Sequence, residues 1–66
     1  MSFKVAIKVR GESTSSYNGL RFATSEEATN YGRNLYSRWM LMESFSIEES
    51  EESVNYAWVD GNLMHL

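Results

Sequence analysis

The sequence contains no cysteine and only one histidine, His65, among its 66 residues. Without cysteine the chain forms no disulfide and offers no thiolate to a metal ion. A single imidazole does not make a structural zinc site, which takes four nitrogen or sulfur ligands. We therefore expect no metal site and no cofactor, and the stability of so small a domain must come from packing or from self-association.

The chain also lacks a long apolar run. No stretch approaches the roughly 20 apolar residues that a membrane-spanning helix requires. The opening residues, Met-Ser-Phe-Lys-Val-Ala-Ile-Lys-Val-Arg, alternate polar and apolar side chains, whereas a secretory signal peptide needs an unbroken apolar stretch. We expect a cytoplasmic protein with no membrane contact.

Length and composition favour one thin globular domain over residues 1–66. A chain of this length buries only about 60% of the surface that its unfolded form exposes, so one small core is expected. Hydrophobic residues make up 42% and aromatic residues 14%, which is typical of folded rather than disordered chains. The net charge of −3 disfavours general DNA binding, which needs a strong positive field.

Residues 3–10 alternate with a period of two, which indicates a half-buried β-strand. The core-facing side chains are Phe3, Val5, Ile7 and Val9, and the opposite set is Lys4, Ala6, Lys8 and Arg10. A polar loop over residues 11–19 follows. Leu20 and Phe22 then predict a second strand over residues 20–23, which forms a hairpin with the first.

The segment Thr24-Ser25-Glu26-Glu27 is a capping box. In this motif the Thr24 hydroxyl accepts from the Glu27 amide, and the Glu27 carboxylate returns to the Thr24 amide. An amphipathic helix over residues 25–40 is predicted to follow, with an apolar stripe of Ala28, Tyr31, Gly32, Leu35, Trp39 and Met42. Gly32 costs up to about 1 kcal/mol of helix propensity, so we expect it to permit a close approach between the helix and a strand.

The remaining strands are predicted at residues 44–48, 54–59 and 62–66, with an acidic connector over residues 48–53. Asp60-Gly61 is the preferred pair for a type I′ turn, which would place Trp58 opposite Leu63 and Tyr56 opposite His65. The order ββαβββ predicts an α+β fold. We expect a single antiparallel sheet of four to five strands with one helix packed on one face.

The sequence favours a non-catalytic protein. A serine nucleophile needs a base, and the sole imidazole belongs to His65, which we interpret as a surface residue of an edge strand. The carboxylates cluster in one connector, while acid–base catalysis needs two carboxyls in different environments within a cleft. The loop over residues 11–19 contains glycine and hydroxyl groups, but it lacks the Gly-Lys-Ser/Thr that opens a helix in a phosphate-binding loop.

Two charged features have alternative interpretations. The acidic run from Glu48 to Glu52 is a contact for a basic partner or, as we favour, a solvated connector whose charge protects a sheet edge. Four basic side chains are predicted to project from the sheet face away from the helix, and they are candidate nucleic-acid contacts: Lys4, Lys8, Arg10 and Arg21. RNA-binding sheets interleave exposed aromatic residues with basic ones, and this predicted face shows none, so nucleic acid is the weaker interpretation.

The aromatic residues exceed what so thin a core buries easily. Tyr, Trp, Arg and Met are the residue types enriched at protein interfaces. We therefore predict a protein-contact surface from the end of the helix to the final hairpin, with the candidate contacts Tyr36, Arg38, Met40 and Trp58. The alternative is that Tyr31, Trp39 and Trp58 simply fill a core that lacks bulk.

Two stretches carry a family resemblance: Gly19-Leu-Arg-Phe-Ala-Thr-Ser-Glu-Glu-Ala28, followed by Tyr31-Gly32 and Arg38-Trp39, and Val54-Asn-Tyr-Ala-Trp-Val-Asp-Gly-Asn-Leu63. As a pair they resemble small uncharacterised proteins encoded in bacteriophage and some bacterial genomes. The resemblance implies a phage or phage-like accessory protein in the bacterial cytoplasm, and the family has no known activity to carry over to this chain. We expect a protein partner, for which a host factor is one candidate. Nucleic-acid binding and a structural homo-oligomer built by pairing edge strands are the alternatives.

Overall fold

The computed structural model describes all 66 residues. Its elements are β1 (Ser2–Val9), β2 (Ser15–Tyr17), α1 (Ser25–Arg38), β3 (Met42–Ser50), β4 (Tyr56–Val59) and β5 (Asn62–His65). All strand pairs are antiparallel. The predicted α+β class is confirmed.

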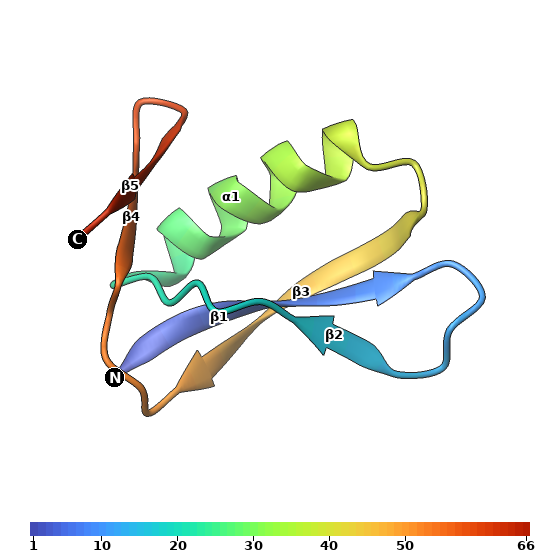
Figure 1. Cartoon of the computed structure of the whole chain (residues 1–66), viewed down its shortest axis with the longest axis horizontal. Coiled ribbons are helices and arrows are strands. Elements are labelled where there is room, and N and C mark those ends of the chain that lie inside the picture. Colours follow the sequence, from blue (N-terminus) through green and yellow to red (C-terminus); the bar gives the residue numbers. More distant parts are fainter.

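The strands form two separate sheets, so the predicted single sheet is wrong. β2, β1 and β3 make a three-stranded sheet in that order, and β4 and β5 form a hairpin of their own. In Figure 1 this hairpin stands near the start of α1, with its strands running across the direction of β1 and β3. The reason is that backbone amides of β4 bond to a loop carbonyl and a helix side chain, at Arg21 and Glu27, instead of to another strand.

The second strand is displaced from its predicted position. β2 lies inside the predicted loop and pairs with β1 over only three residues. Gly11, with φ of 89°, reverses the chain soon after β1, where the Glu12 amide donates to the Val9 carbonyl at 3.0 Å. The segment 20–23 contributes one isolated bridge, in which Phe3 and Phe22 exchange backbone hydrogen bonds of 2.8 and 2.9 Å.

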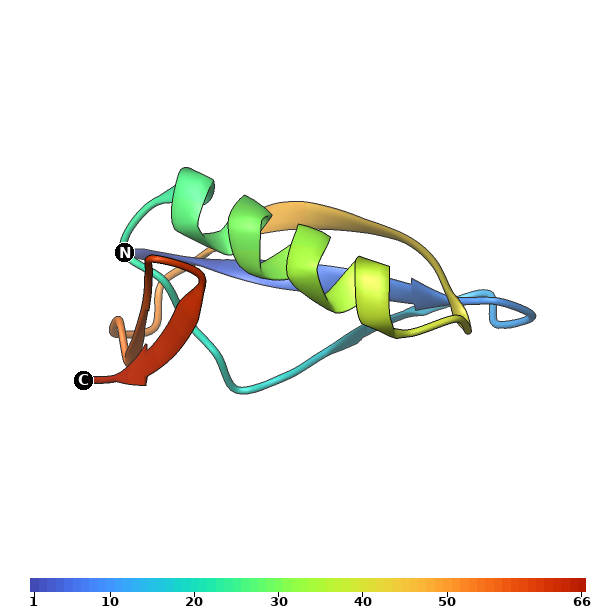
Figure 2. The same ribbon diagram turned by 90° about the horizontal axis from the view of Figure 1, so that it is seen from above.

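The helix α1 runs diagonally over one face of the three-stranded sheet (Figure 2). The core beneath it consists of Val5, Ile7, Phe22, Ala28 and Met42. The helix ends at Arg38, earlier than predicted, because Trp39 already has extended dihedral angles of −118° and 104°. This early end lets the chain turn so that the buried side chain of Met42 enters β3. No helix combines the length and the apolar character that crossing a membrane demands.

The turn of the final hairpin and the start of the helix largely follow the sequence predictions. Asp60 and Gly61 have φ of 51° and 78°, as a type I′ turn requires, and the predicted register of β4 against β5 is confirmed. The Thr24 hydroxyl accepts from the Glu27 amide at 3.1 Å, as predicted. The predicted return bond to the Thr24 amide is wrong, because the Glu27 carboxylate accepts from the Thr24 hydroxyl at 3.1 Å and from the Trp58 amide at 3.0 Å.

The closest approach between α1 and the sheet occurs at Gly32, which lies over the ring of Phe45 in β3. A Cβ atom on Gly32 would stand 2.5 Å from Cε2 and 2.6 Å from Cδ2 of that ring. The Phe45 ring also packs against Tyr36, with ring centroids 6.3 Å apart. The predicted role of Gly32 in a close approach of helix to strand is confirmed.

Gly32→Ala is expected to destabilise the protein although alanine is the better helix former. The propensity gain of about 1 kcal/mol is opposed by overpacking against Phe45, which typically costs about 1–3 kcal/mol. We expect a net loss of about 1 kcal/mol in the free energy of unfolding, measured by urea denaturation. Phe45→Val removes the ring atoms, so the double variant should lose less than the sum of the two single variants. Strict additivity would show that the contact carries no strain.

Candidate functional site

Large apolar side chains are exposed around the end of α1. We call four of them the helix-end cluster: Tyr36 (50% exposed), Trp39 (37%), Met40 (90%) and Leu41 (58%). The guanidinium of Arg38 is exposed beside them, with Nε donating to the Asn34 carbonyl at 3.4 Å. Three of the predicted protein contacts, Tyr36, Arg38 and Met40, are therefore exposed at the end of α1. Trp39 and Leu41, which the predicted contact set did not include, are exposed in the same segment.

The backbone beneath the helix-end cluster is anchored, although its side chains are exposed. The Trp39 amide donates to the Leu35 carbonyl at 3.0 Å, and the Met42 amide donates to the Trp39 carbonyl at 3.2 Å. The Leu41 carbonyl accepts from the Arg10 amide at 2.7 Å, which ties the cluster to the end of β1. These bonds hold the backbone that carries the exposed side chains.

Trp58 lies apart from the other predicted protein contacts. Its indole packs edge-on against Tyr31 with ring centroids 5.9 Å apart, and Tyr31 in turn packs against Phe22 at 5.4 Å. Trp58 belongs to β4, which stands near the start of α1 (Figure 1), whereas Tyr36 lies in the last turn of that helix. The predicted continuous surface from the helix end to the hairpin is therefore wrong. Trp58 and Tyr31 are instead half-buried against the core, as the alternative interpretation held for them, whereas Trp39, which that interpretation also placed in the core, is exposed.

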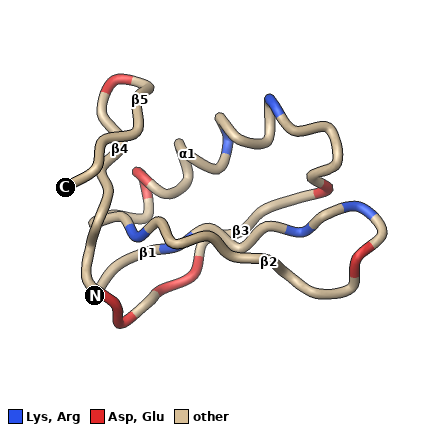
Figure 3. The backbone as a smooth tube through the Cα atoms, viewed as in Figure 1, with Lys and Arg blue, Asp and Glu red and all other residues tan.

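Two of the predicted basic residues, Lys4 and Lys8, do project from the sheet face away from α1, each next to a partner. The Lys4 ammonium lies 4.4 Å from the centre of the Tyr17 ring, and Lys8 forms an ion pair with Glu43 at 3.6 Å. Figure 3 shows acidic and basic segments interspersed along this part of the backbone. The expectation that this face lacks an aromatic residue is wrong, because β2 brings Tyr17 onto it.

The hydroxyl group of Tyr17 donates to the Glu48 carboxylate at 3.1 Å. This hydrogen bond raises the pKa of Tyr17, because ionising the phenol would lose the donor. Ring, ammonium and carboxylate thus form a neutralised group on the sheet, and the Lys4 charge is not presented alone to solvent.

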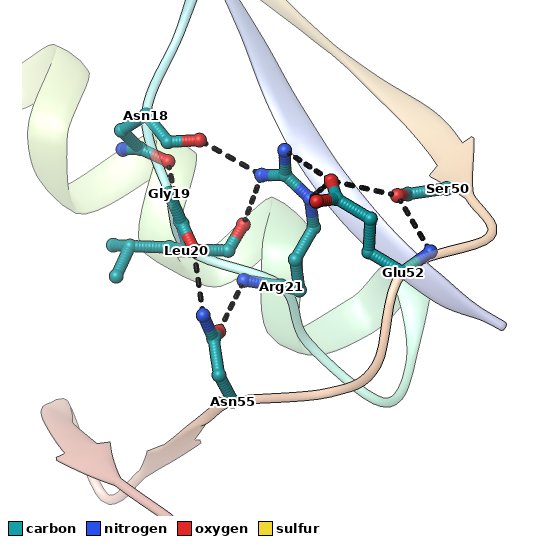
Figure 4. A network of polar contacts seen from close by, with 7 residues as sticks. All are labelled: Asn18, Gly19, Leu20, Arg21, Ser50, Glu52 and Asn55. Carbon is teal, nitrogen blue, oxygen red and sulfur yellow. Dashed lines mark hydrogen bonds and ion pairs between the residues drawn. The ribbon is translucent and has the colours of Figure 1, made fainter.

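Arg21 does not project from an open sheet face, because only 12% of its side chain is exposed. Its Nη2 lies 2.7 Å from Glu52 Oε1, and its Nε donates to the same oxygen at 2.8 Å. Its Nη1 donates to the carbonyls of Asn18 and Leu20 at 2.8 and 3.0 Å (Figure 4). The guanidinium thus joins the 18–22 segment to the connector after β3, and its role is structural.

Asn55 completes this polar network from the other side of the segment. Its side-chain nitrogen donates to the Gly19 carbonyl at 2.7 Å, and its side-chain oxygen accepts from the Arg21 amide at 2.7 Å (Figure 4). The Asn55 amide itself donates to the Arg21 carbonyl at 3.0 Å. Residues 19–21 are therefore held by an asparagine that is distant in sequence.

The acidic run is divided between two elements, so the predicted connector over residues 48–53 begins too early. Glu48 and Glu49 belong to β3, and Glu51 and Glu52 follow it. Glu49 and Glu51 line the one surface hollow, together with Met1 and Ser50. No group of three or more His, Asp or Glu side chains converges as metal ligands would.

His65 lies in the exposed strand β5, as predicted for a surface residue of an edge strand. Its ring packs against Tyr56 with centroids 4.8 Å apart. The surface hollow is lined by residues of the N-terminus and the end of β3, and His65 is not among them.

No protein-family model, no curated protein and no solved structure matches this chain. The resemblance to bacteriophage proteins therefore stays a prediction. Function has to be inferred from the surfaces that the chain itself presents.

We expect the pKa of the Glu52 carboxyl to lie below its usual range because Arg21 donates a hydrogen bond to it and carries a positive charge beside it. A depressed pKa means that ionised Glu52 stabilises the fold above the pKa of the unfolded chain, and that this contribution disappears as the pH falls through the folded value. The stability difference between the wild type and Glu52→Gln should be constant near neutral pH and should shrink as the pH falls below the unfolded value and through the folded one.

Carbon-detected NMR titration of Glu52 provides the direct measurement, with Arg21→Met as the matched variant. The titration midpoint should rise in that variant. A midpoint that stays unchanged would show that the ion pair does not form in solution.

Proposed function

We propose that this chain is a non-catalytic accessory protein, and that the helix-end cluster together with Arg38 is its contact surface for another protein. The observation that carries the proposal is the exposure of four neighbouring large apolar side chains, from 37% at Trp39 to 90% at Met40. Large exposed apolar side chains gathered in one short segment, with charged residues beside them, are typical of protein interaction sites.

The anchored backbone supports this proposal. Binding costs free energy when loops and side chains lose freedom, and a surface fixed in advance avoids part of that cost. Trp39 and Tyr36 are large residues with few rotatable bonds, and Arg38 supplies a planar donor group beside them. These three residue types dominate the binding energy of measured protein interfaces.

The size of the helix-end cluster suggests a transient complex. Covering four partly exposed apolar side chains contributes on the order of 4–8 kcal/mol before the costs of association are subtracted. A dissociation constant of 1 μM corresponds to about 8 kcal/mol, so hydrogen bonds at the rim have to contribute as well. Arg38 and Arg10, whose backbone is bonded to Leu41, place positive charge at that rim and favour an acidic partner surface.

Nucleic-acid binding is supported less well. Lys8 faces Glu43, Arg21 is enclosed with Glu52, and Lys4 lies over the Tyr17 ring, whose hydroxyl donates to Glu48. Phosphate binding would have to break these contacts before gaining its own. We infer a protein partner in the bacterial cytoplasm, such as a host factor, and the cellular setting rests on the resemblance to bacteriophage proteins.

Affinity capture from a bacterial lysate at physiological salt tests the proposed surface. Met40→Glu introduces a charge into the helix-end cluster, and Met64→Glu introduces the same charge at a methionine of β5 that is 50% exposed. We expect the wild type and Met64→Glu to recover the same partner, and Met40→Glu to recover at least tenfold less.

Circular dichroism should show the same helix content for all three proteins, because both methionines are exposed. Equal recovery by Met40→Glu, or no protein recovered by the wild type, would rule out the helix-end cluster as a binding surface.

A further inference from the structure

We propose that a second copy of this chain pairs with β5 edge to edge, so that two hairpins form one four-stranded antiparallel sheet about a two-fold axis. The inference rests on which strand edges have free backbone groups and on which of those edges carry charge. It concerns a different surface from the helix-end cluster.

Two of the four sheet edges are unsuited to self-pairing. The free edge of β2 is only three residues long. β3 is longer, but it carries Glu43, Glu48 and Glu49, and an antiparallel second copy would bring Glu43 opposite Glu49 when the two strands are centred on Ser46. Like charges that face each other across strands are destabilising.

The outer edge of β4 is already occupied. The Tyr56 amide donates to the Arg21 carbonyl at 3.2 Å, and the Trp58 amide donates to the Glu27 carboxylate at 3.0 Å. These two amides point away from β5, because the bonded residues in an antiparallel pair alternate along the strand. No further strand can add there without displacing the loop and the helix side chain.

The outer edge of β5 is open. In the register of the hairpin, Tyr56 lies opposite His65 and Trp58 lies opposite Leu63. Since the backbone groups of Tyr56 and Trp58 point away from β5, those of His65 and Leu63 point away from β4. The Leu66 amide donates inward to the Asn55 carbonyl at 3.0 Å, which is the alternation expected. Leu63 and His65 therefore offer two amides and two carbonyls at an exposed edge.

The chemistry of β5 favours a second copy of the same strand. Its sequence and the residue after it, Asn-Leu-Met-His-Leu, contain no acidic residue, no lysine and no arginine. Leu63, Met64 and Leu66 are 40, 50 and 69% exposed. An exposed apolar edge strand is the usual place at which a sheet acquires another strand, and a two-stranded hairpin is marginally stable by itself.

A two-fold axis at Met64 would give a hydrogen-bond partner to each free amide and carbonyl of Leu63 and His65. Leu63 would face His65 of the second copy, and each such pair would exchange two N–H···O bonds. Met64 would face Met64 of the second copy in a pair of the closely spaced type, with Cα atoms about 4.5 Å apart. Because the outer edges of both β4 strands are occupied, the sheet closes at four strands and does not grow into a fibre.

The two-fold pairing is compatible with the proposed binding surface. The hairpin lies near the start of α1, and the helix-end cluster lies beyond its other end (Figure 1). A dimer formed through β5 therefore leaves both copies of the cluster uncovered and would present two binding surfaces to a partner.

Charge substitution at Met64 tests the proposed dimer through sedimentation equilibrium of the full chain, from about 10 μM to about 1 mM. We expect the wild type to dimerise over this range. Met64→Lys and Met64→Glu should each weaken dimerisation at least tenfold, because like charges would face each other across the axis. An equimolar mixture of the two variants should recover the dimer, because Lys would then face Glu.

Met40→Lys is the matched control, since Met40 is also exposed and lies outside the hairpin. It should dimerise as the wild type does. A wild type that is monomeric at the highest concentration would overturn the proposal. So would a dimer that persists unchanged in both Met64 variants, or a mixture that shows no recovery.

Amide hydrogen exchange gives a residue-specific second measurement. The amides of Leu63 and His65 should become more protected as the concentration of wild-type protein rises, because their hydrogen bonds exist only in the dimer. Protection that rises at β3 instead would place the contact on the other edge and contradict the inference. Loss of dimerisation with retained partner capture in Met64→Glu would separate this interface from the helix-end cluster.

Discussion

The side chain of Asn55 holds the two sheets of this molecule in contact. It donates to the Gly19 carbonyl and accepts from the Arg21 amide, both at 2.7 Å, and the same loop reaches β1 through the bridge between Phe22 and Phe3. A side-chain amide that uses both its donor and its acceptor on one backbone segment fixes the direction of that segment. The hairpin is therefore docked in one position. A second bond fixes the same position, because the Trp58 amide of the hairpin donates to the Glu27 carboxylate of the helix.

This docking divides the aromatic residues into two groups with different roles. Along the first half of α1 the hairpin packs Trp58 against Tyr31, which in turn packs against the buried ring of Phe22. At the other end nothing covers the helix, so Tyr36 and Trp39 stay exposed above an anchored turn. The small core thus needs only part of the aromatic content of the chain, and the rest is available for contact with another molecule.

The sequence was most informative where a structure depends on neighbouring residues. Alternation in residues 3–10 identified β1, the Asp60-Gly61 pair identified the hairpin, and Gly32 identified the approach to Phe45. Prediction from the sequence failed where polar groups that are distant along the chain determine the structure. Arg21 has the same alternation as an outward-facing strand residue, but its guanidinium bonds to Glu52, 31 positions away, and residues 20–23 join the sheet only through the single bridge of Phe22 to Phe3. Within the candidate site the pattern placed Tyr36 and Met40 correctly at the helix end, but it gave no sign that the hairpin would carry Trp58 to the opposite end of α1.

The contact between Gly32 and Phe45 constrains how these two positions can change during evolution. The Phe45 ring occupies the space that a side chain on Gly32 would need, since a Cβ atom on Gly32 would stand 2.5 Å from that ring. Neither position is then free to vary independently during divergence. A descendant that gains a methyl group in the helix would regain stability by giving up ring atoms in the strand, and such paired exchanges would help to identify distant descendants after the rest of the sequence has changed.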